Sequence, residues 1–222
     1  MALLALFALC AWQIAAGGPL RSFDVRLDRA LAGSALPSPT AELFADLGNT
    51  AVALPVLVLA LAYAAWRARR AGMARWWPAP LAAAVAMAAV PALIAPLKAL
   101  IDRPGPPGPL ADQSGFFPSG HAATAAVAYG AAVLLLSPLL GQRLRRPLLV
   151  AVVLLNLCVG AGLVRRGYHW PLDVVASWCL SGCLLWAVGL LSRFEANHRL
   201  GSLTGWGHSP VEVKRRLRSS AG

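Results

Sequence analysis

The sequence has few charged residues and few cysteines, and both scarcities exclude common classes of protein. Only 13% of its 222 residues are charged, whereas 58% are hydrophobic, which is too apolar for an ordinary water-soluble domain. The four cysteines, Cys10, Cys158, Cys179 and Cys183, lie in apolar stretches, where thiols pack as small hydrophobic groups. The sequence therefore argues against a soluble protein, a disulfide framework and a zinc site. It implies no metal and no other cofactor.

The charged residues are confined to short clusters, and six long stretches have none. Each is close to the ~20 residues that a helix needs to cross a hydrocarbon core of about 30 Å. The stretches are 1–20, 47–66, 76–97, 116–142, 147–164 and 174–192. We therefore predict an all-α fold, a polytopic membrane protein built as a bundle of six transmembrane helices.

The bundle is expected to form one domain over residues 1–192, followed by a basic, flexible cytoplasmic tail over 193–222. The first stretch has no basic residue before it and no clean small-residue cleavage site, which favours a retained helix over a signal peptide. In the segment 21–46, Phe23, Val25, Leu27 and Leu31 alternate with Arg and Asp, a pattern typical of a short interfacial helix.

The basic residues divide unequally between the two sides of the predicted bundle. The connections 67–75 and 143–146 and the tail carry 13 basic residues and two acids, and the other side carries seven of each. The positive-inside rule places the first group in the cytoplasm. The net charge of +11 is thereby explained by topology and contact with lipid headgroups, without nucleic acid as a partner.

Ionisable residues gather at the helix ends on the outer side. Placing such residues near the bilayer costs free energy, so they indicate a functional site. They come from three separate connections, and comprise Lys98, Asp102, Arg103, His121, Arg165, Arg166, His169 and Asp173. Cations and N–H donors are what a transferring phosphoryl group needs, together with a nucleophile and an acid. We expect Ser119 to cap a helix that begins there, with Gly120 admitting the phosphate to its free N–H groups.

These residues resemble the motifs of the type 2 phosphatidic acid phosphatases, which share their site with the vanadium haloperoxidases. That family shows K-x6-R-P, P-S-G-H and S-R-x5-H-x3-D. Residues 118–121 match the second motif completely, and residues 169–173 match the end of the third. Lys98 with Arg103-Pro104 is similar to the first. The resemblance covers about residues 47–192.

The resemblance implies a role for each matched position. His169 would be the nucleophile that forms a phosphohistidine, Asp173 would orient it, and His121 would protonate the leaving oxygen. Lys98 would bind the phosphate with Ser119 and Gly120. The implied activity is that of a membrane lipid phosphatase acting on a polyprenyl diphosphate or monophosphate, or on a lipid of the phosphatidic acid type, at the outer face.

Two positions depart from the family pattern. In strict register the arginine of the first motif falls on Gly105, and the S-R of the third falls on Gly162-Leu163. Arg103, and Arg165 or Arg166, would then have to bind the phosphate from neighbouring positions, and Gly105→Arg is expected to rescue a loss of Arg103. The displaced arginines also leave open an alternative from another class, a catalytically silent membrane scaffold or lipid transporter.

Overall fold

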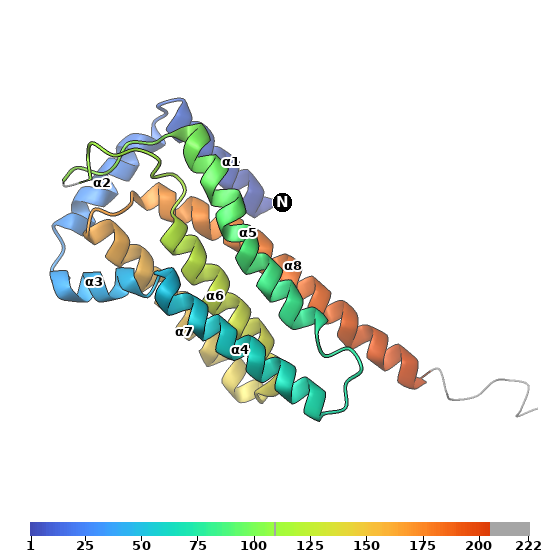
Figure 1. The fold of residues 1–222 in the computed structure, drawn as a ribbon. Coiled ribbons are helices and arrows are strands. Elements are labelled where there is room, and N and C mark those ends of the chain that lie inside the picture. The colour runs from blue at the N-terminus through green and yellow to red at the C-terminus, as the bar shows by residue number, and fades with distance from the viewer. Residues whose placement is uncertain (109, 205–222) are drawn as a thin grey trace, which may run out of the picture.

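The computed structural model describes residues 1–108 and 110–204, and within these it is helical and contains no strand. The predicted all-α fold is therefore confirmed (Figure 1). The helices are α1 (Ala2–Ala15), α2 (Leu20–Ala32), α3 (Ser38–Asp46), α4 (Thr50–Arg70), α5 (Pro78–Ile101), α6 (Gly120–Leu136), the short 3-10 helix η1 (Ser137–Leu139), α7 (Gln142–Arg165) and α8 (Pro171–Thr204).

Five of the described helices are long and apolar enough to cross a membrane, namely α4, α5, α6 with η1, α7 and α8. Their outward faces carry exposed large hydrophobic side chains such as Leu59, Val85, Val153 and Trp186, as lipid-facing surfaces do. Helix α8 continues through Thr204, beyond the predicted end of the last span at residue 192. The rest of the predicted tail, 205–222, lies outside the described residues.

The predicted first span, 1–20, is not one straight helix. Helix α1 ends at Ala15, and the chain bends by 92° into α2, so a sixth span is counted only if this bent pair is taken as one. At the bend Gly17 has a positive φ of 66°, which a glycine adopts without strain. The side chain of Gln13 accepts a hydrogen bond from the N–H of Leu20 at 3.1 Å and so caps the start of α2.

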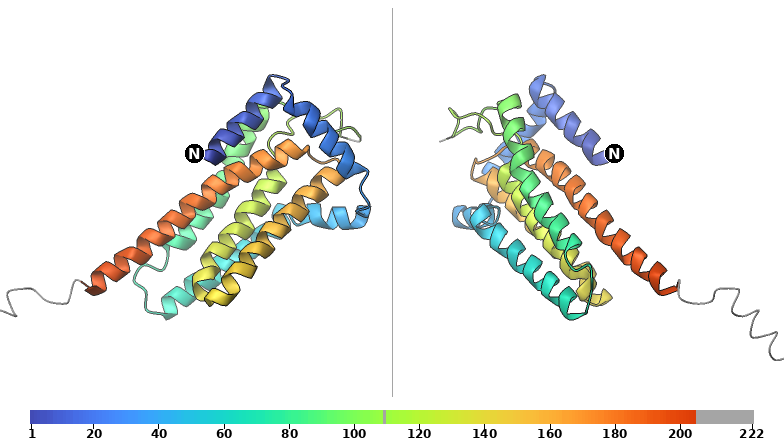
Figure 2. Two further views of the ribbon diagram at one scale, coloured as in Figure 1. Left: turned by 180° about the vertical axis from the view of Figure 1, so that it is seen from behind. Right: turned by 45° about the vertical axis from the view of Figure 1, so that its right-hand side comes forward.

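Helix α6 is the centre of the bundle, and α4, α5, α7 and α8 surround it (Figure 2). Its sequence is rich in alanine, and most of its side chains are buried. Small side chains allow neighbouring helices to approach closely, which is how membrane helices pack without a hydrophobic driving force between them. Because α6 is held on all sides, the residues at its start have a fixed position.

The predicted interfacial segment 21–46 forms two helices, α2 and α3, at one end of the bundle (Figure 1). Helix α3 lies across α7, and the two are in close contact because α7 has Gly162 at the crossing. A β-carbon at Gly162 would lie 2.5 Å from the carbonyl oxygen of Ala41. Helix α2 runs past the end of α7 and the start of α8 and covers this end of the bundle.

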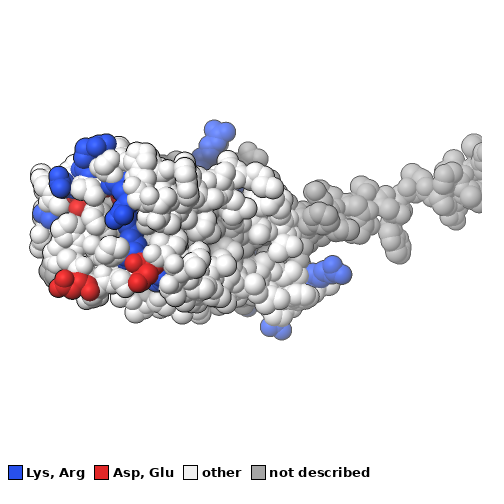
Figure 3. All heavy atoms as spheres, turned by 90° about the horizontal axis from the view of Figure 1, so that it is seen from above, with Lys and Arg blue, Asp and Glu red and all other residues white. Residues whose placement is uncertain are grey.

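Charged side chains gather at the ends of the molecule, as a membrane protein requires (Figure 3). In that view the acidic side chains all lie at one end, and the long middle of the surface is nearly free of charge. This end carries α2, α3, the C-terminus of α5 and the N-terminus of α6. The arginine-rich connections after α4 and before α7 lie at the opposite end.

Candidate active site

A large cavity opens at the acidic end of the bundle and runs down between α4 and α5. Its volume is about 1280 Å³. Lys98, His121 and His169 line it at one end, and Gly120 lies beside them. Three connections that are far apart in the sequence therefore bring their ionisable side chains to one cavity, as the sequence predicts.

The cavity wall also has a long apolar part, which follows two helical stripes. On α5 the stripe begins at Ala84 and passes Ala88, Pro91 and Ala95 before it reaches Lys98. These residues are three or four apart, so they share one face of the helix. The facing stripe on α4 consists of Leu54, Leu57, Val58 and Leu61. From Lys98 to Ala84 the groove is about 20 Å long at 1.5 Å per residue, which covers two thirds of a hydrocarbon core.

Helix α5 forms this stripe without a break, although Pro91 and Pro96 both lie inside it. A proline cannot donate the hydrogen bond of its turn, and a membrane helix tolerates this where the freed carbonyl faces protein or a cavity. Pro91 lines the cavity itself.

The start of α6 is capped as expected. Ser119 is fully buried, and its hydroxyl oxygen accepts a hydrogen bond from the N–H of Ala122 at 3.2 Å. The N–H groups of Gly120 and His121 therefore remain for an anion at the positive end of the helix dipole. Ser119 itself does not line the cavity. Its hydroxyl therefore caps the start of α6 and does not form part of the cavity wall.

The starts of α6 and α8 are joined by hydrogen bonds, which sets the distance between the two histidines. The N–H of Ser119 donates to the carbonyl oxygen of Asp173 at 3.2 Å. The hydroxyl of Ser177 lies 2.8 Å from the carbonyl oxygens of both Ser119 and Asp173. Because all three residues are fully buried, these bonds are not exchanged with water.

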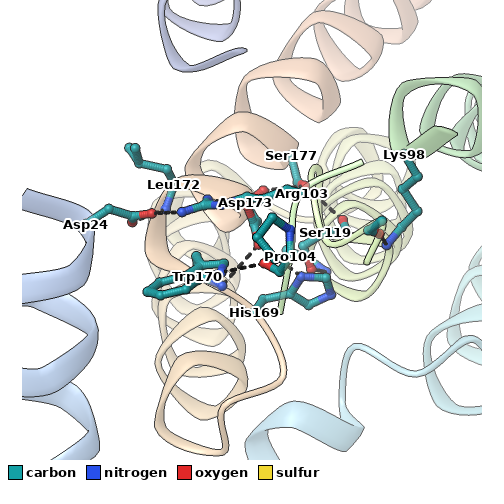
Figure 4. A network of polar contacts seen from close by, with 12 residues as sticks. Asp24, Lys98, Arg103, Pro104, Ser119, His169, Trp170, Leu172, Asp173 and Ser177 are labelled. Carbon is teal, nitrogen blue, oxygen red and sulfur yellow. Dashed lines mark hydrogen bonds and ion pairs between the residues drawn. The ribbon is translucent and has the colours of Figure 1, made fainter. Parts of the chain in front are cut away.

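Asp173 and His169 are paired across the start of α8 (Figure 4). The Oδ2 atom of Asp173 accepts the N–H of Trp170 at 3.0 Å and lies 3.4 Å from Nδ1 of His169. The second distance is long for a hydrogen bond, as is common for catalytic groups before a substrate binds. With Nδ1 facing the carboxylate, Nε2 of His169 is the nitrogen left for a substrate. The ring of Phe116 contacts the imidazole edge-on, with 5.7 Å between the ring centres.

Arg103 does not line the cavity. It is 3% exposed, and its two terminal nitrogens donate to Oδ1 of Asp173 and to Oδ2 of Asp24, a residue of α2. Figure 4 shows the guanidinium between the two carboxylates, on the side of Asp173 away from Lys98. Its planar group also stacks on Trp170, 4.9 Å from the ring centre. The donors that the sequence assigns to a phosphate are thus directed at protein carboxylates.

The other two candidate arginines also lie outside the cavity wall. Arg165 donates from Nε to the carbonyl oxygen of Leu36 at 3.3 Å. Arg166 is exposed and pairs with Glu42, whose carboxylate also accepts the hydroxyl of Tyr168 at 2.8 Å. Tyr168 and then Glu42 raise the pKa of Arg166 by stabilising its charged form. Among the described residues, Lys98 is the one lysine or arginine in the cavity wall, and its ammonium donates to the carbonyl oxygen of Gly115.

The comparisons with known proteins agree with this geometry. A family model described as the PAP2 superfamily matches residues 79–195, more than half of the chain. The chain belongs to the PAP2 superfamily. A solved structure, described as the first transmembrane PAP2-type phosphatidylglycerolphosphate phosphatase from Bacillus subtilis, is similar over 88% of this chain and 95% of its own, with a TM-score of 0.73 and 22% identity. No curated protein matches the chain. The predicted family is confirmed, and with it the multi-pass membrane fold.

The structure explains why the PAP2 arginine positions hold other residues here. A β-carbon at Gly105 would lie 2.2 Å from the carbonyl oxygen of Leu110, so the loop leaves no room for a side chain there. Leu163, at the other arginine position, is fully buried in the hydrophobic core. Gly162, the serine position before it, is in contact with α3. The expected rescue by Gly105→Arg is therefore wrong, because the side chain has no space.

Sequence reasoning missed three residues of the site region. Glu42 and Asp46 of α3 line the cavity, and Asp24 is fully buried behind Asp173. A signal for Asp24 exists in the sequence, since an acid amid the apolar positions of an amphipathic helix is unusual. Its partner Arg103 lies 79 residues away, and only the tertiary structure brings the two together.

Proposed function

We propose that this PAP2 protein hydrolyses a phosphate ester or anhydride of a membrane lipid through a phosphohistidine. The observation that carries the proposal is the cavity, which joins the two histidines and Lys98 to an apolar groove between membrane helices. A lipid whose tail lies between α4 and α5 would present its phosphate to Lys98, His121 and His169. A small soluble phosphate would leave the groove empty.

The first step of the proposed reaction is attack on phosphorus by Nε2 of His169. A bond forms between this nitrogen and phosphorus, and the bond from phosphorus to the lipid oxygen breaks. The protonated imidazole of His121 gives its proton to that oxygen, so the lipid leaves as an alcohol, or as a monophosphate if the substrate is a diphosphate. Asp173 accepts the Nδ1–H of His169 and stabilises the positive charge that develops on the ring.

The second step returns the protein to its starting state. Water attacks the phosphorus, His121 accepts a proton from this water, and the phosphorus–nitrogen bond breaks to release inorganic phosphate. Lys98 and the N–H groups at the start of α6 stabilise the phosphoryl oxygens in both steps. This assigns the charge stabilisation to Lys98, Gly120 and His121, and leaves Arg103, Arg165 and Arg166 with contacts outside the phosphate site.

We place the site on the outer membrane face, because the arginine-rich connections lie at the opposite end of the bundle. Polyprenyl diphosphates, polyprenyl monophosphates and phosphatidic acid remain the candidate substrates. To these we add phosphatidylglycerolphosphate, the substrate in the name of the similar Bacillus subtilis protein. All have an apolar tail suited to the groove and a phosphate that can meet Lys98.

Purified protein in detergent should release phosphate from at least one of these four lipids, measured with and without a chelator. His169→Ala, purified in parallel, is the control and should release none. Activity that is lost in chelator and restored by magnesium would contradict the histidine mechanism. If wild-type protein releases no phosphate from any of them, the silent scaffold or transporter is correct, which the lack of arginine in the described cavity wall would explain.

A further inference from the structure

Asp24 connects helix α2 to the candidate nucleophile through a chain of buried charges (Figure 4). Its Oδ2 atom accepts a hydrogen bond from Arg103, and Arg103 donates to Oδ1 of Asp173. The other oxygen of Asp173 faces His169. Asp24 and Asp173 are both fully buried, and Arg103 is 3% exposed. The chain Asp24–Arg103–Asp173–His169 thus runs from α2 to the cavity without solvent between its members.

Asp24 also holds the start of α8. Its Oδ1 atom accepts the N–H of Leu172 at 2.8 Å, in the first turn of that helix. The first four N–H groups of a helix lack partners within the helix, and a carboxylate there is stabilised by the helix dipole. Both carboxylate oxygens of Asp24 therefore accept hydrogen bonds. Oδ1 accepts from the backbone N–H next to Asp173, and Oδ2 accepts from Arg103, which in turn donates to the side chain of Asp173.

The charges in this chain determine what Asp173 can do for His169. A lone guanidinium fully paired with Asp173 would neutralise that carboxylate in a region of low dielectric. Here Arg103 divides its two terminal nitrogens between two carboxylates, so with both of them ionised the group of three keeps one net negative charge. This charge is what favours the positive imidazole that develops when His169 attacks phosphorus.

We propose that Asp24 is a positioning residue for the phosphoryl-transfer reaction, which acts on His169 through Arg103 and Asp173. The inference rests on the proposed function and goes beyond it, because Asp24 lies before the region matched by the family model, 79–195. Arg103 belongs to the same positioning chain and not to the phosphate site. Helix α2 therefore packs over this end of the bundle and also supplies a residue that positions His169.

Other charged groups also face His169, and the test must separate them from Asp24. Those on the cavity wall are Lys98 of α5, His121 of α6, Glu42 and Asp46 of α3, and the phenol of Tyr168. Asp28 lies one turn beyond Asp24 on α2 and is nearly buried. Asp28→Asn is the matched control. It makes the same substitution on the same helix, at a carboxylate for which no hydrogen bond to Arg103 is seen.

The test compares pH–activity profiles of wild type, Asp24→Asn, Arg103→Gln and the double variant on the best lipid substrate. Asp24→Asn should lower kcat at least about tenfold and change KM less than about twofold, because it disturbs orientation and not binding. It removes a negative charge and favours the neutral imidazole, so the acid limb should move to lower pH by about half a unit or more. Arg103→Gln removes a positive charge and favours the protonated imidazole, so the acid limb of its pH–activity profile should move to higher pH.

The double variant gives the decisive result. With Asp24 and Arg103 both neutral, the net charge next to His169 is again that of the wild type, so the acid limb should return close to its original pH. Asp28→Asn removes the same charge one helical turn farther along α2, and should move the limb less than half as far as Asp24→Asn does. An acid limb in the double variant that stays as far from its original pH as in Asp24→Asn, or equal shifts in Asp24→Asn and Asp28→Asn, would overturn the proposal. So would misfolding of both Asp24→Asn and the double variant, since Asp24 would then serve folding alone.

A second readout does not need turnover and separates this inference from the proposed function. The neutral imidazole of His169 reacts with diethyl pyrocarbonate, and peptide mass spectrometry gives the rate at each pH. The midpoint of this rate should be lower in Asp24→Asn than in wild type, and higher in Arg103→Gln. Identical midpoints in all three would overturn the positioning chain, even if the wild-type protein is an active phosphatase. Shifted midpoints in a protein without activity would instead contradict only the proposed function.

Discussion

Gly105 lies so close to the carbonyl oxygen of Leu110 that a β-carbon there would be 2.2 Å from it. The same loop is closed by a hydrogen bond from the N–H of Gly105 to the carbonyl oxygen of Gln113 at 2.9 Å. This contact leaves no room for a side chain at the position where the motif K-x6-R-P would place its arginine.

The first prediction concerns this loop. Gly105→Arg, alone or with Arg103→Ala, should lower the thermal unfolding temperature and abolish activity, because the overpacked loop must move away from Phe116 and the site. Unfolding of purified protein and phosphate release are the measurements. Gly189→Ala is the control, since a β-carbon there meets nothing within 4 Å. Recovery of activity in the Arg103→Ala background would contradict the structure.

The second prediction separates the cation in the cavity from those outside it. Lys98→Met should lower kcat/KM about 100-fold or more, the scale for one donor to a developing charge. Arg166→Met removes an exposed ion pair with Glu42 and should change kcat/KM less than about threefold. The two variants remove the same charge at the same side of the bundle, and steady-state kinetics compares them. Similar losses in both would show that Arg166 reaches the phosphate.

The third prediction tests His121 as the acid. His121→Ala should lower activity on a lipid phosphate by about 10²–10⁴-fold, because an alkoxide is a poor leaving group without a proton. On p-nitrophenyl phosphate the first-turnover burst of nitrophenolate should be nearly retained, since this group leaves without a proton. His169→Ala should show no burst. An equal loss on both substrates would assign His121 to phosphate binding instead.

The fourth prediction tests the apolar groove. Ala88 of α5 lines the cavity, and Ala88→Trp should fill the space between α4 and α5. The KM for a long-chain lipid phosphate should rise about tenfold or more, while a short-chain analogue changes less than about twofold, since only the long tail needs the groove. Val85→Trp, at an exposed position on the same helix outside the cavity wall, should have little effect. If the two variants behave alike, the tail lies elsewhere.

The fifth prediction tests orientation. In a background without the four native cysteines, a cysteine at Gly108 should react with an impermeant thiol reagent in intact cells. A cysteine in the arginine-rich turn at Arg145 should react only after the membrane is opened. Labelling of the Arg145 position in intact cells would place the site on the cytoplasmic face.

The sequence alone determined the fold class, five of the six predicted membrane spans and the cap of α6, because these depend on local properties. A charge-free stretch of 20 residues has few alternatives to a membrane helix, and Ser119 caps the residues next to it. His169 and Asp173 are four residues apart, so their contact was also within reach of the sequence. The motif order indicated that His121 and Lys98 would join them, as the cavity shows.

The tertiary structure decided which cationic side chains face the cavity, because the spacing of residues along the sequence does not determine where a side chain points. Arg103 is five residues from Lys98, yet it turns toward a carboxylate 79 residues away in the sequence. Asp24 lies in an amphipathic helix whose partner the sequence does not name. The space at Gly105 and Gly162 depends on where another stretch of backbone passes. Burial and close packing follow from the whole fold, and they decided which of the predicted residues could reach a phosphate.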